Sequence, residues 1–492
     1  MKVCFCLRST QETERMRAGT ERIYFLAIGG VAMGNCAILA KSSGCTVGGS
    51  DRAVYGPVDE LLRANGIDFF DGYREENIGR FGPDLVVVGN GVGRGNPEVE
   101  WLLDSGKIPY TSLPQFLFER FLRERHRLAI TGTHGKTTTA ALCAYYLRQK
   151  KIRAGYFIGG APLDFPCGAD LGDSSAPFVL EGDEYDSAFF DKRSKFIHYG
   201  AHTLVIGGIE FDHADIFRDL IDVERAFDHL LRTVPRSGQI FYNGDCDRCR
   251  ALLAKFPWTP AHSVGLGEDN DFRIRNMTVS QSGTAWEIAS KYRRTAVNSD
   301  LVGEFNARNG TMAILAAHGA SGSTPPPTVD LRNFSGVQRR QRLLRRDGRC
   351  AVYEDFGHHP SAIREVLRAM RTLYPGSELI ACFEPASRTA MGRFLEKEFV
   401  GALSLADRCF LARPGRSEIL PADERLRPAE MAEQLRGNVL EAVAFEENCA
   451  LLGRLLELLD EDSGNFRVAV LFSNGPFAGV LSHWKRCENG RT

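Results

Sequence analysis

The sequence has no long apolar run and almost no net charge, and each absence excludes a class of protein. It contains no stretch of about 18 consecutive apolar residues, which a membrane-spanning helix requires. Its 61 basic and 62 acidic side chains leave a formal net charge of −1. General nucleic-acid binders cluster Lys and Arg against phosphates, so this balance argues against that function. We therefore expect neither a membrane nor a nucleic acid as a partner.

Signs of disorder, secretion and disulfide bonding are also scarce. The 50 glycines and 21 prolines in 492 residues are too few for a collagen-like or disordered chain. The 13 cysteines are scattered and mostly lie in apolar runs, which is typical of reduced thiols in a cytoplasmic enzyme. Cys246 and Cys249 form a CxxC pair without a second pair nearby, so metal or redox use is disfavoured. Residues 1–20 lack the apolar core of a secretory signal and are expected to be an irregular leader.

The length predicts about three domains, at roughly 150 residues each. Short apolar strands alternate with helical segments, which indicates an α/β fold with mainly parallel sheets. We expect a Rossmann-like domain over residues 21–125, a central P-loop ATPase-like domain over 126–328 and a Rossmann-like C-terminal domain over 329–492. The segment Ser321–Pro327 is the strongest linker signal and marks the end of the central domain.

Apolar runs locate the individual strands. The first domain is expected to end in a charged helix over Pro114–Arg127. The predicted strands are Ile23–Ile28, Thr46–Gly49 and Asp84–Val88 in the first domain, Arg127–Thr131, Phe178–Leu180 and Leu204–Ile206 in the central domain, and Cys350–Tyr353, Leu379–Phe383, Cys409–Leu411 and Val468–Phe472 in the C-terminal domain.

The sharpest local motif is TGTHGKTT at Thr131–Thr138, directly after a predicted strand and before a predicted helix over Thr139–Lys150. Such a glycine loop directs backbone N–H groups and the positive end of the helix dipole at phosphate oxygens. Lys136 would add a charge near the β- and γ-phosphates, and the Thr137 hydroxyl would hold Mg²⁺. The usual motif has glycine where Ile130 stands, so the loop is a tighter variant. Its predicted ATP-binding residues are Gly132, Thr133, His134, Gly135, Lys136, Thr137 and Thr138.

Two further predicted strands of the central domain end in acidic residues and a histidine. Phe178–Leu180 runs into Glu181, and Leu204–Ile206 is followed by a loop that carries His213. Ligands of open parallel sheets gather beyond the carboxyl ends of the strands, so these side chains are expected near Lys136 and Thr137. Mg²⁺ prefers oxygen ligands. The predicted magnesium site is therefore Thr137, Glu181 and the less usual ligand His213.

A second glycine loop lies near the N-terminus, where Gly29 and Gly30 follow the first predicted strand and Asp51 follows about 20 residues later. This arrangement resembles a dinucleotide fold, but Ala27 stands at the first fingerprint glycine. The loop is compatible with NAD, with the diphosphate of another nucleotide or with a tight turn that binds nothing. An NAD-dependent oxidoreductase and a nucleotide-binding regulatory protein without catalysis therefore stay open as alternatives.

Taken together, these motifs resemble the Mur ligases, ATP-dependent enzymes that form the amide bonds of the bacterial peptidoglycan peptide. TGTHGKTTT at 131–139 is similar to their phosphate loop. Gly303–Asn309 resembles their adenine-contacting segment, which implies Asn306 and Asn309 as ATP ligands. Gly336–Arg340 resembles the start of their C-terminal domain, where Arg340 would reach the phosphates. Tyr353–Pro360 resembles the segment in which Asp355 would bind the ATP ribose.

Four segments resemble one branch of this family in particular. They are Arg94–Glu100, Glu184–Phe196, Gly208–Phe217 and Phe383–Pro385. This branch joins UDP-N-acetylmuramate to the murein tripeptide L-alanyl-γ-D-glutamyl-meso-diaminopimelate recovered from old cell wall, through an acyl phosphate. The alternative is the branch that adds L-alanine to the same nucleotide sugar in new synthesis, which shares the Gly-His-His-Pro run.

Several departures from the wider family also bear on function. No lysine lies between His213 and Val234, so no carbamoylated lysine is expected. No Asp-Asn-Pro-Arg run is present, which members that add free diaminopimelate use. Ala386 stands where the resemblance implies a basic residue, and Arg388 is the candidate to replace it.

The resemblance implies a set of roles. Lys136, Glu181, His213 and Arg340 would be catalytic, with Arg340 orienting the phosphate as a bidentate fork and Lys136 stabilising charge. The group that deprotonates the attacking amine stays open between His213, a carboxylate and water. A cytoplasmic monomer or weak dimer that uses Mg²⁺ and ATP is expected. The implied UDP-sugar ligands are Gly29, Gly30, Asp51, Asn90 and Arg94, and the implied peptide ligands are Lys192, Arg193, His358 and Arg388.

Overall fold

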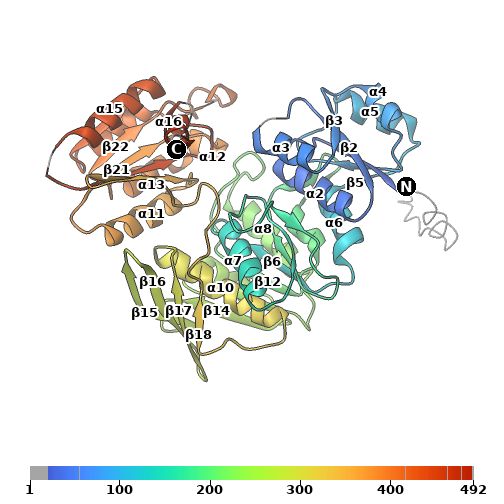
Figure 1. Ribbon diagram of the computed structural model, residues 1–492, viewed down its shortest axis with the longest axis horizontal. Helices are drawn as coiled ribbons and strands as arrows, with labels where there is room; N and C mark the ends of the chain where they lie inside the picture. Colours follow the sequence, from blue (N-terminus) through green and yellow to red (C-terminus); the bar gives the residue numbers. More distant parts are fainter. Residues whose placement is uncertain (1–19, 55, 416, 463, 478, 490–492) are drawn as a thin grey trace.

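A computed structural model describes residues 20–489, apart from positions 55, 416, 463 and 478. The described residues form three large sheets that follow one another along the chain, each covered by helices (Figure 1). We call the parts built on them the N-terminal, central and C-terminal regions. The expected leader, residues 1–20, lies outside the described residues except for its last position. Among the described helices, none combines the length and apolar character needed to cross a bilayer.

The N-terminal region is a parallel sheet with the strand order β3-β2-β1-β4-β5. This order, with the first strand in the middle, is that of the first five strands of a Rossmann fold. The first strand is buried almost throughout, as expected where helices cover both faces of a sheet. The strands are β1 (Arg22–Leu26), β2 (Thr46–Asp51), β3 (Asp68–Asp71), β4 (Leu85–Val88) and β5 (Tyr110–Ser112), and the helices are α2 (Val31–Ser42), α3 (Gly56–Ala64), α4 (Glu75–Phe81), α5 (Pro97–Ser105) and α6 (Leu113–Leu117).

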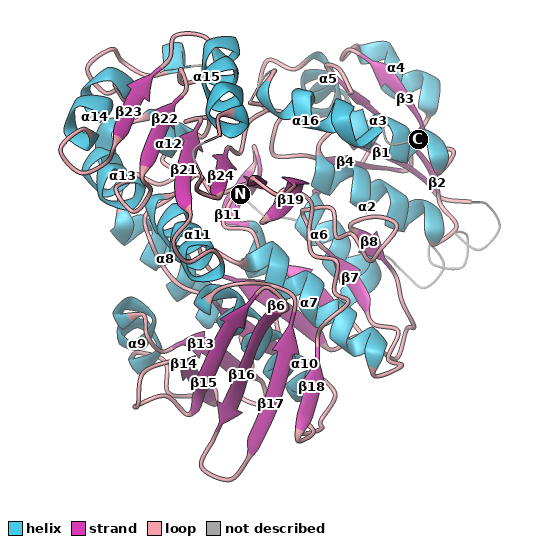
Figure 2. Cartoon of the chain, turned by 60° about the vertical axis from the view of Figure 1, so that its left-hand side comes forward, coloured by secondary structure: helices cyan, strands magenta, loops and turns pink. Residues whose placement is uncertain are grey.

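The central region is a long mixed sheet with the order β18-β17-β16-β15-β14-β13-β12-β6-β9-β7-β8. Its parallel half contains β6, β9 and β12, and its antiparallel extension, β15 to β17, is in the foreground of Figure 2. The strands are β6 (Arg127–Thr131), β7 (Gly155–Phe157), β8 (Ala169–Asp170), β9 (Phe178–Glu181), β12 (Thr203–Ile206), β13 (Gln239–Asn243), β14 (Ala261–Gly265), β15 (Phe272–Ser280), β16 (Gly283–Ala289), β17 (Arg294–Ser299) and β18 (Thr328–Asp330).

Two helices, α7 (Lys136–Gln149) and α10 (Glu304–Ala320), pack against each other over the parallel half of this sheet. Their apolar faces share one core with β6, β9 and β12. Two pairs of buried polar groups in this core are hydrogen-bonded, which offsets the cost of their desolvation. The Tyr146 hydroxyl lies 2.8 Å from His318 Nε2, and Trp286 donates to the Thr311 hydroxyl at 2.9 Å. The remaining elements are the hairpin β10 (Asp186–Ala188) and β11 (Asp191–Ser194), α8 (Leu220–Leu231) and α9 (Asp247–Ala254).

The C-terminal region has the order β19-β20-β24-β21-β22-β23, parallel except for the edge strand β19. Apolar side chains on both faces of β20, β21 and β24 are buried beneath flanking helices. The strands are β19 (Arg342–Arg346), β20 (Cys350–Asp355), β21 (Glu378–Phe383), β22 (Arg408–Leu411), β23 (Glu441–Ala444) and β24 (Arg467–Phe472), and the helices are α11 (Pro360–Leu373), α12 (Arg388–Met391), α13 (Glu396–Leu403), α14 (Pro428–Leu435), α15 (Asn448–Asp460) and α16 (Val480–Asn489).

The predicted fold class, three α/β parts with mostly parallel sheets, is confirmed, but two local predictions are wrong. The helix expected over Pro114–Arg127 is shorter: α6 passes into a π-helical turn that ends at Leu122. At this end the Leu122 carbonyl accepts a hydrogen bond from the Arg127 guanidinium at 3.0 Å instead of from a backbone N–H of a further helical turn. The chain then turns into β6.

The proline-rich segment Ser321–Pro327 does not leave the central sheet. It connects α10 to β18, whose residues pair in parallel with Ala296–Asn298 of β17. The Thr295 hydroxyl donates to the Pro326 carbonyl at 2.9 Å and so ties the segment to the sheet. Proline in this position is tolerated because the segment precedes an edge strand.

We expect Leu204→Ala to loosen the middle of the central sheet. Leu204 is fully buried on β12, and such truncations cost about 2–5 kcal/mol through lost burial and the cavity left behind. The measurement is native-state hydrogen exchange of the β6 and β12 amides, which reports local stability in a chain with several regions. The control is Ile221→Ala on α8, where the isoleucine is 63% exposed. It is expected to change the free energy of protection by less than about 0.5 kcal/mol. Equal effects of the two changes would contradict this account of the core.

Candidate active site

The loop between β6 and α7 has the geometry of a phosphate cradle. Helix α7 begins at Lys136, earlier than the predicted Thr139, because Gly135 caps it in a left-handed conformation with φ of 77°. A Cβ atom at Gly135 would lie 2.5 Å from Asn309 Oδ1, so only glycine fits there. The first N–H groups of a helix have no partner within the helix and point outward. The predicted loop Gly132–Thr138 therefore lies at the N-terminus of α7, and its Gly135 packs against Asn309 of α10.

Lys136 is held by a partner that the sequence reasoning did not assign. Its Nζ donates to the Gly132 carbonyl at 2.8 Å and lies 2.8 Å from Glu184 Oε2. Burial alone would lower the pKa of Lys136, but the charge of Glu184 and its hydrogen bond raise it above the usual value. Lys136 is thus a fully charged group beside the loop. The sequence signal for Glu184 is the acidic run that begins at Glu181, the residue of that run predicted as a metal ligand.

Thr137 and Glu181 form a pair of oxygen ligands. The Thr137 hydroxyl donates to Glu181 Oε1 at 2.7 Å, and the Gly159 N–H donates to Oε2 at 2.7 Å. Burial raises the pKa of Glu181, against these hydrogen bonds, which lower it. A buried carboxylate next to a hydroxyl at a phosphate loop fits Mg²⁺, which prefers oxygen ligands and retains water or phosphate positions. The structure therefore brings together two of the three predicted metal ligands.

His213 lies nearby on the loop after β12, but its ring faces a different group. It stacks edge-on against Tyr185 with 4.5 Å between the ring centroids, and its backbone has a positive φ of 58°. Burial would raise the pKa of Asp183, whereas Lys195, Lys136 and His213 together lower it. Among the contacts of the described residues, no hydrogen bond joins His213 to Thr137 or Glu181. His213 thus borders the acidic run that begins at Glu181.

The predicted nucleotide ligands of the C-terminal region converge on the same loop. Arg340 is half-buried, and its guanidinium lies over the Phe356 ring, 4.6 Å from the ring centroid. Burial lowers the pKa of Arg340, while the nearby charges of Asp355 and Glu181 oppose that change. Asp355 accepts hydrogen bonds from the N–H groups of Gln341 at 2.9 Å and Gly357 at 2.7 Å. The charge of Arg340 therefore interacts with the carboxylates of both Glu181 and Asp355.

The two asparagines expected at adenine lie on the first turns of α10. Asn306 donates to Gln341 Oε1 at 2.8 Å, and Asn309 donates to Asn306 Oδ1 at 3.3 Å. Since Asn309 also packs against Gly135, the phosphate loop, α10 and the start of the C-terminal region form one connected surface.

In the N-terminal region, the predicted UDP-sugar residues lie on the loop after β1, at the end of β2 and on the loop after β4. Asp51 Oδ2 accepts the Gly29 N–H at 2.8 Å, so the carboxylate caps the glycine loop next to Gly30. Ala27, at the position of the missing fingerprint glycine, has a positive φ of 66°, which explains why glycine is common there. Asn90 and Arg94 lie in the loop after β4, and Arg94 is exposed and paired with Glu100 at 2.9 Å.

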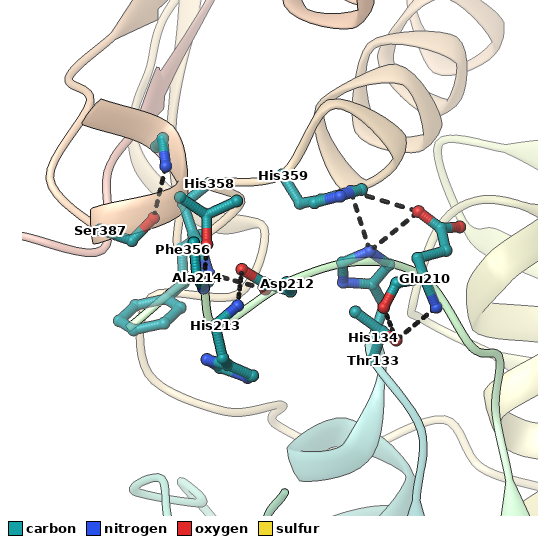
Figure 3. A network of polar contacts seen from close by, with 12 residues as sticks. Thr133, His134, Glu210, Asp212, His213, Ala214, Phe356, His358, His359 and Ser387 are labelled. Carbon is teal, nitrogen blue, oxygen red and sulfur yellow. Dashed lines mark hydrogen bonds and ion pairs between the residues drawn. The ribbon is translucent and has the colours of Figure 1, made fainter. Parts of the chain in front are cut away.

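The structure does not bring the four predicted peptide ligands together. Lys192 and Arg193 lie on the exposed hairpin of the central region and pair with Asp186 at 2.5 Å and Asp191 at 2.7 Å. The other two, His358 and Arg388, belong to the C-terminal region. His358 Nε2 lies 3.5 Å from Asp212 Oδ2, and Arg388 is in α12, whose Thr389 hydroxyl accepts the Ala214 N–H at 3.1 Å. The latter two therefore border the loop that carries His213, as Figure 3 shows for His358.

His134 was expected to bind ATP, and its side chain contacts two residues that the sequence did not identify. His134 Nε2 lies 3.1 Å from His359 Nδ1 and 3.5 Å from Glu210 Oε2 (Figure 3). Sequence signals existed for both, since Glu210 precedes His213 and His359 belongs to the Gly-His-His-Pro run. Their meeting depends on the docking of two regions that are far apart in the chain.

Three family profiles match the chain in succession. Residues 22–124 match the Mur ligase family catalytic domain, 130–317 the Mur ligase middle domain and 339–469 the Mur ligase glutamate ligase domain. The chain is 40% identical, over 80% of its length and 85% of the relative, to the UDP-N-acetylmuramate–L-alanyl-γ-D-glutamyl-meso-2,6-diaminoheptandioate ligase of Escherichia coli. It is 35% identical to the enzyme of the same name from Haemophilus influenzae, over 94% of this chain and 97% of that one.

A solved structure supports the same relationship. A murein peptide ligase from Psychrobacter arcticus matches 96% of this chain and 99% of its own with a TM-score of 0.67 and 29% sequence identity. Sequence profiles, full-length relatives and a three-region fold with a phosphate loop at its centre thus agree. This chain belongs to the Mur ligase family.

Proposed function

We propose that the chain is an ATP-dependent ligase that joins L-alanyl-γ-D-glutamyl-meso-diaminopimelate to UDP-N-acetylmuramate, as in the recycling of peptidoglycan. The observation that carries the proposal is the convergence of Lys136, the Thr137–Glu181 pair and Arg340 on one loop, with Arg340 supplied by a different region. The similarity to full-length relatives named for this reaction supports the choice of substrates. We further propose that it acts in the cytoplasm as a monomer or weak dimer.

The chemistry requires activation of a carboxylate. ATP transfers its γ-phosphoryl group to the lactyl carboxylate of UDP-N-acetylmuramate, the α-amine of the tripeptide attacks the acyl phosphate, and phosphate leaves with the formation of the amide. Two anions must approach each other, so the protein contributes mainly alignment and positive charge. Lys136 neutralises charge on the transferred group, and Arg340 orients it with a bidentate fork. Mg²⁺, held by Thr137 and Glu181 with His213 at the edge of the site, would further neutralise the phosphates.

Each region has a proposed part in this reaction. Residues 21–125 would bind the nucleotide sugar at Gly29, Gly30, Asp51, Asn90 and Arg94. Residues 126–328 would bind ATP, and 329–492 would add Arg340, Asp355 and the site for the incoming peptide. Closure of the regions on one another excludes water, which otherwise hydrolyses an acyl phosphate. Of the four peptide ligands suggested by sequence, we retain His358 and Arg388, since both border the His213 loop.

The amine donor is the first test. With ATP, Mg²⁺ and UDP-N-acetylmuramate present, the purified protein is expected to release phosphate when the tripeptide is added and far more slowly with L-alanine. The measurement is phosphate release together with mass-spectrometric detection of the UDP-linked product. An equal or faster rate with L-alanine would replace the proposed substrate by the amino acid.

The second test concerns Lys136. We expect Lys136→Ala to lower kcat by about 10²–10³-fold, because a charge aimed at the transferred phosphoryl group is lost. The change also leaves Glu184 buried without its partner, so the double variant Lys136→Ala with Glu184→Gln separates catalysis from folding. Both variants should show this loss of kcat, and the double variant should unfold at a temperature close to that of the original protein. Lys150→Ala, exposed at the end of α7, is the control that should retain the full rate.

The third test concerns the metal. Glu181→Gln keeps the size of the side chain but removes its charge, so we expect the Mg²⁺ concentration for half-maximal activity to rise by at least about tenfold. Rates are measured over a Mg²⁺ titration at saturating ATP and substrates. The matched control is Glu268→Gln, whose carboxylate is 83% exposed on another part of the central region. An unchanged Mg²⁺ requirement in Glu181→Gln would exclude Glu181 as a ligand.

A further inference from the structure

A cluster of nitrogen and oxygen ligands lies outside the Thr137–Glu181 pair. It consists of His134 from the phosphate loop, Glu210 from the loop after β12 and His359, the residue that caps α11 (Figure 3). His359 Nδ1 lies 3.1 Å from His134 Nε2 and 3.2 Å from Glu210 Oε2, and the latter two atoms are 3.5 Å apart. Two residues therefore come from the central region and one from the C-terminal region.

These separations are close to those of a four-coordinate zinc site, with two of the three slightly shorter. Bonds of about 2.0–2.2 Å to His nitrogen and carboxylate oxygen, in tetrahedral geometry, place neighbouring ligand atoms about 3.3–3.6 Å apart. The three atoms of the cluster form a triangle with edges of 3.1, 3.2 and 3.5 Å. A cation slightly above the plane of this triangle would contact all three with only small adjustments, and would leave one position for water.

Hydrogen bonds around the cluster orient its ligands. His359 Nε2 lies 3.2 Å from the Phe211 carbonyl oxygen, which can only accept, so Nε2 carries the proton. His359 Nδ1 faces the cluster and also accepts the Ser361 N–H at 3.4 Å, the contact by which His359 caps α11. The Ser361 hydroxyl donates to the Glu210 carboxylate. Outer hydrogen bonds of this kind, to a backbone carbonyl and from a hydroxyl, are those that fix metal-binding histidines and carboxylates in place.

Two acceptor atoms of the cluster face each other. His359 Nδ1 lies 3.2 Å from Glu210 Oε2, and a positive ion between them relieves the repulsion of their lone pairs.

We propose that His134, Glu210 and His359 form a binding site for a transition-metal cation such as Zn²⁺, which bridges the phosphate loop and the C-terminal region. Two imidazoles and one carboxylate suit Zn²⁺, whereas Mg²⁺ favours oxygen ligands alone. The site is therefore separate from the oxygen pair of Thr137 and Glu181. His134 and Glu210 retain 30% and 35% of their side-chain exposure, so the ion has access from solvent.

The test is Zn²⁺ binding to the full-length protein after treatment with a chelator, in the presence of excess Mg²⁺. Equilibrium dialysis is expected to find one tightly bound Zn²⁺, and X-ray absorption at the zinc edge should find nitrogen and oxygen ligands without sulfur. Substitution by Co²⁺ should give the intense visible absorption of a four-coordinate ion. None of these measurements depends on catalytic activity, so failure of the proposed ligase reaction would not affect them.

Substitutions test which residues bind the Zn²⁺ ion. His359→Asn removes the imidazole but keeps an oxygen that caps α11, and Glu210→Gln removes only the charge. Each is expected to weaken Zn²⁺ binding by at least about tenfold. His358→Asn, at the neighbouring histidine, and Cys246→Ser, in the CxxC pair, should leave binding unchanged. Unaltered affinity in both His359→Asn and Glu210→Gln, loss of binding in Cys246→Ser, or a sulfur ligand in the absorption spectrum would overturn the proposal.

Discussion

The parallel pairing of β6 with β9 on one side and β12 on the other is the constraint on which the rest of the molecule depends. It sets three strand ends side by side, so the loops that follow them share one edge of the central sheet. The phosphate loop, the acidic run that begins at Glu181 and the loop that carries Glu210 and His213 all begin at this edge. The C-terminal region then covers it and adds Arg340 and His359. Neither the oxygen pair nor the histidine cluster would exist with another strand order.

Most of the fold was predictable because the strands of a parallel sheet are buried on both faces and appear as short apolar runs between turn residues. Such runs predicted β6, β9, β12 and the main C-terminal strands closely. The errors occurred where a side chain or a tertiary contact overrides local pattern. Arg127 ends a helix that composition would extend, and the prolines before β18 are followed by one more strand of the same sheet.

The candidate site was predictable to the extent that its residues belong to short motifs. Lys136, Thr137 and Glu181 follow directly from a strand, a glycine loop and a second strand end, and the structure brings them together. Glu184, Glu210 and His359 could not be assigned, since each gains its role from a partner far away in the chain. His213 and the pair Lys192 and Arg193 illustrate the converse. Their motif was recognised, but the directions of their side chains depend on loop geometry that spacing does not specify.

The contact between Lys136 and Glu184 has a consequence for ligand discrimination. The carboxylate of Glu184 stands where an anion would bind at the lysine, so an incoming ligand must offer more than that carboxylate provides. A small anion with a single charge would gain nothing over the partner it displaces. Under the proposed function, a triphosphate would gain contacts along the whole loop and with Arg340. The internal carboxylate would then act as a competitor that favours the triphosphate over small anions.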